Sequence, residues 1–153
     1  MRVVDILNQE LVVSELRSTT QTGVLRELSE QLAARYPHLK TDDLVGVLQE
    51  RERLGTTAIG EGIAIPHGKL RGLKKVVAVF GRSLTGIDCR SLDGALTQLF
   101  FLLVAPEDSA GIHLKALARV SRLLKDKSFR ERLLQAETQT NLFQIIAEED
   151  AKL

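Results

Sequence analysis

The sequence has few of the residues and segments that mark secreted, metal-binding or membrane proteins. Its single cysteine, Cys89, cannot form an intramolecular disulfide, and it contains neither a Cys-x-x-Cys nor a His-Glu-x-x-His motif. The longest apolar run, residues 99–105, is far too short to span a bilayer, and the first residues lack the apolar core of a secretory signal. We therefore expect a cytoplasmic protein that is not inserted in a membrane.

An excess of charge of either sign is also absent. The 21 Lys and Arg residues against 20 Asp and Glu give a net charge of +1, so there is no electrostatic reason to expect nucleic acid or a membrane surface as partner. With 153 residues, short linkers and no repeat or low-complexity segment, the chain has the length of one domain. We predict a single domain over residues 1–153.

Five segments have the apolar spacing of amphipathic helices. Thr20 or Thr22 is available as the N-cap of the first segment, and Thr41 offers a capping hydroxyl to the second. Leu114, in the third, is among the residues expected to face the core. These helices are predicted over residues 22–35, 41–53, 108 or 109 to 124, 127–137 and 139–148.

Two continuous apolar runs predict strands that are buried on both faces. The first covers residues 76–80 and is expected to end at Gly81, and the second covers residues 97–105 and stops at Pro106. A helical turn followed by a short strand is expected within residues 3–16.

Residues 60–69 concentrate glycines and a proline around one histidine. Pro66 forces the residue before it into an extended conformation, so we expect a short strand there and His67 on a rim just beyond it. Gly68 allows an anion to approach the backbone closely, and Lys69 adds a positive charge. Since imidazole is partly neutral and nucleophilic at physiological pH, this setting suits a histidine that carries phosphate.

Two other polar residues fall on stripes that should face the core. Arg51 lies seven residues after Leu44, so either it extends from the last helical turn to a carboxylate or backbone carbonyl, or it points at His67 as an anion clamp. His113 lies on the inward side of the first turn of the third helix. It is either a core histidine hydrogen-bonded to a carbonyl or part of an anion site beside free backbone N–H groups.

Nucleotide and metal sites are not supported by the residue spacing. Five residues separate Gly62 from Gly68, one more than in a phosphate-binding loop, and Leu70 stands where such a loop needs Ser or Thr. A zinc site built from His67, His113 and a carboxylate is a weak case, because the three histidines of the chain have unrelated spacings. We expect neither a cofactor nor a metal.

Residues 51–70, read as RERLGTTAIGEGIAIPHGKL, resemble the mannitol/fructose-class enzyme IIA domains of the bacterial phosphoenolpyruvate-dependent phosphotransferase system. The resemblance covers essentially the whole chain, and the ending Pro-His-Gly-Lys-Leu is most similar to the nitrogen-regulatory branch. One departure is Thr56-Thr57, where the family often has Ser-Thr, and it keeps the hydroxyl.

The resemblance implies an α/β fold, a single-domain sandwich in which a mixed, partly antiparallel sheet carries helices on both faces. It also implies that His67 accepts a phosphoryl group from a phosphorylated HPr-like carrier, with Arg51 and His113 flanking that group. The protein would then be a phosphotransferase with a phosphohistidine intermediate. Its further partners would be regulatory target proteins or, as the alternative, a fructose/mannitol-type enzyme IIB of sugar transport; we expect the regulatory role.

Overall fold

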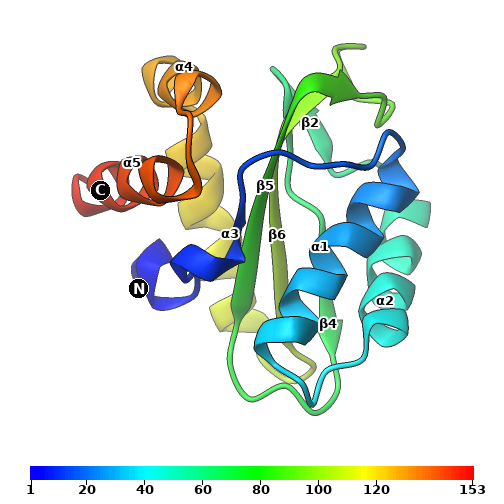
Figure 1. The fold of residues 1–153 in the computed structure, drawn as a ribbon. Helices are drawn as coiled ribbons and strands as arrows, with labels where there is room; N and C mark the ends of the chain where they lie inside the picture. Colours follow the sequence, from blue (N-terminus) through cyan, green and yellow to red (C-terminus); the bar gives the residue numbers. More distant parts are fainter.

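In the computed structural model, which describes residues 1–153, a mixed six-stranded sheet lies between helices on its two faces (Figure 1). One face is covered by α1 (Gln21–Arg35) and α2 (Thr41–Arg53). The other is covered by α3 (Ala110–Leu124) and α5 (Gln139–Ala151), with α4 (Lys127–Gln135) packed at the ends of both. The predicted fold class and the five predicted helices are confirmed.

The centre of the sheet is the antiparallel pair β5 (Val77–Ile87) and β6 (Thr97–Pro106), whose inner residues are buried on both faces. The N-terminal segment forms two short 3-10 turns and then β1 (Val12–Val13), which runs parallel to β5. This matches the turn and strand predicted there. None of the helices is both long and apolar enough to cross a membrane.

Three short strands extend the sheet beyond β6. In the order β1-β5-β6-β3-β2, β3 (Ile63–Ala64) runs parallel to β6, and β2 (Ala58–Gly60) pairs with β3. β4 (His67–Leu70) also pairs with β6, farther along the same edge. The ladder is interrupted between β3 and β4 because Pro66 has no N–H to donate, although its carbonyl still accepts from Leu103 at 2.9 Å. The predicted rim at His67 is therefore the start of a fourth strand.

Gly81 was predicted to end its strand, and that prediction is wrong. β5 continues to Ile87, with a shift in register after Arg82. The glycine is required by packing, because a Cβ at this position would lie 2.8 Å from Leu28 Cδ2 and 3.0 Å from Leu16 Cδ2. The helix above the strand needs this close approach.

Two local predictions about the helices also need correction. Thr20 caps α1 by accepting from Gly23 N at 3.1 Å, as predicted, but Thr41 is the first helical residue of α2, which has no side-chain cap. Leu114 is 65% exposed. The inward stripe of α3 is set by His113 and by the residues three, seven and ten positions later, and Leu114 is rotated about 100° from it.

Candidate functional site

The break between β3 and β4 orients His67. The backbone carbonyl of Ile65, the last residue before the proline, lies 2.6 Å from His67 Nδ1. A carbonyl oxygen can only accept, so Nδ1 carries the hydrogen, and in neutral His67 the lone pair belongs to Nε2. The ring is half-buried. One nitrogen is thus fixed to the backbone and the other is free to react.

The structure brings all three predicted site residues to one hollow of about 440 Å³. Arg51 comes from the last turn of α2, His67 from the start of β4, and His113 from the first turn of α3. Gly68 and Lys69, also singled out in the sequence, line the same hollow, and its remaining lining residues are Val47, Glu50 and Leu54. The hollow can hold an anion between two imidazoles and two cationic side chains.

His113 lies against His67, with 5.5 Å between the ring centroids and 45° between the ring planes. The residue is only 7% exposed, and its buried Nδ1 has no hydrogen-bond partner. A core histidine would use such a nitrogen to bond a carbonyl. This geometry favours the interpretation of His113 as part of the site.

Arg51 satisfies parts of both interpretations. Its guanidinium donates to the carbonyl of Gly55 at 3.0 Å, just past the end of α2, as expected for an arginine that extends from a last helical turn. It also lines the hollow of His67. The side chain is therefore anchored to the backbone on the rim of the site, where an arriving anion can replace the carbonyl as its partner.

Burial is the main cause that lowers the pKa of His67 below its usual 6.5. The hydrogen bond to Ile65 opposes this shift, the charge of Arg51 adds to it, and the charge of Glu52 opposes it. The pKa of His113 is lowered first by burial and then by the charges of His67 and Lys69. Both shifts favour the neutral imidazole, the form that a nucleophilic nitrogen requires.

Two contributors to the site were not visible in the sequence. The Ile65 carbonyl is a backbone group, and its only signal was the extended conformation forced by Pro66. Glu52 holds the turn after α2 through Thr57. No signal in the sequence pointed to Glu52. Adjacent residues of a helix do not face the same side, so the spacing that singled out Arg51 says nothing about the residue after it.

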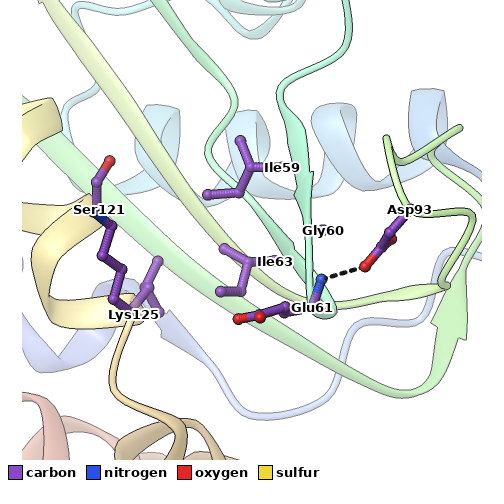
Figure 2. Close-up of a pocket in the computed structure, with 8 residues that line it drawn as sticks. Ile59, Gly60, Glu61, Ile63, Asp93, Ser121 and Lys125 are labelled. Atoms are coloured by element: carbon purple, nitrogen blue, oxygen red, sulfur yellow. Dashed lines mark hydrogen bonds between the residues drawn. The ribbon is translucent and has the colours of Figure 1, made fainter.

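A second hollow of about 440 Å³ contains none of the predicted site residues (Figure 2). It lies between the β2–β3 turn and the end of α3, and Asp93 there accepts the N–H of Glu61 at 2.8 Å. Backbone N–H groups of Glu61 and Ala95 and the hydroxyl of Ser91 hold the pKa of the Asp93 carboxyl below its usual range. Asp93 therefore fixes the turn that leads into β3.

The remaining candidate residues lie away from the His67 hollow. His38 is exposed in the turn after α1. Cys89 is buried, and burial raises the pKa of its thiol to about 11, which disfavours the thiolate that a nucleophilic cysteine needs. No group of three or more His, Cys, Asp or Glu side chains is arranged to hold a metal ion.

Comparison with known proteins matches residues 5–149 to the family described as phosphoenolpyruvate-dependent sugar phosphotransferase system, EIIA 2. A nitrogen regulatory protein of Bradyrhizobium diazoefficiens is 38% identical over 147 residues, which are 96% of this chain and 95% of that protein. The fructose-specific EIIABC component of Bacillus subtilis is 33% identical over 98% of this chain, which corresponds to 24% of that longer protein.

The fold has a counterpart in the crystal structure of the nitrogen regulatory protein IIA-Ntr from Neisseria meningitidis. The TM-score is 0.88 at 29% sequence identity, over 94% of this chain and 98% of that one. The match covers nearly the entire chain, and relatives above 30% identity extend over nearly all of it. The chain belongs to the EIIA 2 family of the phosphoenolpyruvate-dependent sugar phosphotransferase system, whose domains transfer phosphoryl groups.

Proposed function

We propose that this protein is a regulatory phosphocarrier, which accepts a phosphoryl group on His67 from a phosphorylated HPr-like carrier and acts on target proteins according to its phosphorylation state. The observation that supports this most directly is the hydrogen bond of 2.6 Å between His67 Nδ1 and the Ile65 carbonyl. It leaves Nε2 as the nucleophile and fixes the ring on the wall of the hollow. The proposal assigns residues 1–153 to one enzyme IIA domain that acts in the cytoplasm.

In the transfer step, the lone pair of His67 Nε2 attacks the phosphorus of the carrier's phosphohistidine. The new bond to Nε2 forms as the carrier's nitrogen–phosphorus bond breaks, and that electron pair returns to the carrier's ring. The Nδ1 hydrogen of His67 stays in place, so the His67 ring gains positive charge while its bond to the Ile65 carbonyl holds its orientation. The step needs no proton transfer by a separate base.

The rate of this step depends on positioning and on charge stabilisation of the three equatorial phosphoryl oxygens. Arg51 supplies a planar cation that can hold two of these oxygens once it leaves the Gly55 carbonyl. His113, with its unpartnered Nδ1 and its ring beside His67, donates a hydrogen bond to the phosphoryl group or orients the ring.

The regulatory role follows from the charge that the phosphoryl group adds. A phosphorylated side chain carries about −2 at neutral pH, enough to change which surfaces dock beside it. A relative with 38% identity over nearly the full length of both chains is named a nitrogen regulatory protein, which favours this role over transport.

Sugar transport is the alternative, because a fructose-specific component is 33% identical over 98% of this chain. A solved complex of enzyme IIA-mannitol with phosphorylated enzyme IIB-mannitol from Escherichia coli also shares the fold, with a TM-score of 0.77. In this alternative His67 passes its phosphoryl group to an enzyme IIB. Phosphorylated protein mixed with fructose- and mannitol-type enzyme IIB distinguishes the roles, since rapid loss of the group supports transport and retention supports regulation.

The test of the transfer chemistry is incubation with phosphoenolpyruvate, enzyme I and an HPr-type carrier, followed by intact mass and peptide mapping that spare acid-labile phosphoramidates. We expect a carrier-dependent gain of one phosphoryl group at His67. His67→Ala should gain none, whereas His38→Ala, which removes an exposed histidine outside the hollow, should behave as the unaltered protein. No gain by a folded protein with a charged carrier would refute the proposal.

A further inference from the structure

Glu52 follows Arg51 in the last turn of α2 and carries a half-buried carboxylate that the mechanism above does not use. One of its oxygens accepts from the hydroxyl of Thr57. The other accepts from Thr57 N at 3.3 Å and from Gln21 Nε2 at 3.2 Å. The carboxylate therefore joins the last turn of α2 to the first residue of α1 and to the strand-leading turn at residues 54–57.

These three donors are neutral, and no Lys, Arg or His forms an ion pair with Glu52. Withdrawing a carboxylate from water without a cation is costly, and a glutamine could make similar bonds to the same groups. A purely structural link would therefore not need the charge. The Glu52 charge acts to raise the pKa of His67, after the larger effects of burial, the Ile65 hydrogen bond and Arg51.

We propose that Glu52 is a positioning residue of the phosphoryl-transfer site, which fixes the turn that anchors Arg51 and supplies the negative charge that favours the cationic ring of His67 during transfer. This inference rests on the proposed function for its transfer role. The anchoring follows from the contacts, because Arg51 bonds Gly55 and Glu52 bonds Thr57, so both ends of the same turn are tied to one helical turn of α2.

The charge has a role at a defined moment of the reaction. When Nε2 bonds to phosphorus with the Nδ1 hydrogen retained, the ring becomes cationic next to two other cations. The other titratable or charged groups at the hollow are Glu50, Arg51 and Lys69 and the neutral imidazole of His113. Glu50 is exposed and pairs with Arg53 at 3.2 Å. Glu52 does not line the hollow, but its half-buried carboxylate has a charge that favours the cationic form of the His67 ring.

The experiment separates charge from anchoring with three variants of the full-length protein. Glu52→Gln removes the charge and keeps the side chain's shape, and Thr57→Val removes the hydroxyl that holds the carboxylate. Glu30→Gln is the control, since it removes one exposed carboxylate from α1, away from the hollow. For each we measure the His67 titration midpoint by NMR on unphosphorylated protein and the rate of phosphoryl acceptance from a phosphorylated HPr-type carrier.

We expect Glu52→Gln to lower the His67 midpoint and to slow acceptance about tenfold or more. Thr57→Val should change both in the same direction by less, because the freed carboxylate becomes more solvated, and Glu30→Gln should change neither. A His67 midpoint in Glu52→Gln equal to that of the control would overturn the inference, even if the variant were less stable. Should Glu52→Gln not fold, an unchanged midpoint in Thr57→Val would overturn it instead.

The two hypotheses fail in different ways. The titration is read on unphosphorylated protein, so it reports on Glu52 whether or not transfer takes place. An unaltered protein that accepts no phosphoryl group refutes the proposed function. An unaltered protein that accepts it normally, alongside a Glu52→Gln variant with the same midpoint and rate, refutes the role of Glu52 alone.

Discussion

Replacing Arg51 by alanine should slow phosphoryl acceptance by about 100-fold while leaving His67 as the modified residue. In the resting protein the guanidinium is held by one bond of 3.0 Å to the Gly55 carbonyl, and its loss should cost about 1 kcal/mol of stability. In the transition state it would hold charged oxygens, and losing such a donor costs about 3 kcal/mol. An increase of this size in the activation free energy slows the reaction roughly 100-fold.

The pH of the assay decides whether this loss can be attributed to the transition state. The charge of Arg51 lowers the pKa of His67, so its removal lets that pKa rise and more of the ring is protonated below neutrality. At about pH 8 a histidine near its usual pKa is neutral with or without the arginine. A rate measured there isolates the lost charge stabilisation.

The measurement is rapid-quench phosphoryl uptake from a charged HPr-type carrier, with thermal unfolding to verify folding. Arg51→Lys should fall between the unaltered protein and Arg51→Ala, because lysine keeps the charge and loses the planar fork. A rate for Arg51→Ala within twofold of the unaltered protein at pH 8 would refute the role as a clamp and leave only the bond to Gly55.

Three further predictions concern stability and pH. Asp150→Asn should lower the free energy of unfolding, measured with urea, by about 2–3 kcal/mol, because Asp150 is fully buried and lies 2.8 Å from Arg119. Gly81→Ala should cost about 1–3 kcal/mol, because its Cβ would lie 2.8 Å from Leu28 Cδ2; an unchanged urea midpoint would contradict this. Because the pKa of His67 is lowered in the folded protein, the unfolded chain binds its proton more readily. Stability should therefore fall as the pH drops from about 6.5 through the lowered pKa, and His67→Gln should reduce that dependence in unfolding measurements across pH.

The elements of the fold that repeat a simple pattern could be predicted from the sequence. The spacing of apolar residues located the five helices, and the apolar run that ends at Pro106 located β6. Thr20 was recognisable as a cap because its hydroxyl bonds within its own helix, so no distant contact decides the outcome. Predictions of this kind depend on neighbours in the chain.

Two of the predictions that failed, for Gly81 and Leu114, depended on contacts between distant segments. Gly81 has the local signature of a strand end, but leucines 53 and 65 positions earlier in the sequence determine its role. Leu114 and His113 were both predicted to face inward, and the placement of α3 on the sheet decides that His113 does so while Leu114 is exposed. The carbonyl of Ile65 as the partner of His67 could not be derived from residue types, because every residue has a carbonyl.

Arg51 was interpreted either as bonding a carboxylate or backbone carbonyl or as an anion clamp at His67. These two interpretations exclude each other only if the protein has a single state. The arginine bonds a backbone carbonyl and lines the hollow at once, and a phosphoryl group bound as proposed would be the stronger partner, because both groups are charged. The charges lining the hollow are then two cations, Arg51 and Lys69, and one carboxylate, Glu50. A phosphoryl group of about −2, offset by the positive charge that the His67 ring gains on transfer, cancels that excess of one positive charge. A target that docks over the hollow, as proposed, would meet a positive surface before transfer and a surface without net charge after it, so the side chains proposed to stabilise transfer would also make the phosphorylation state recognisable.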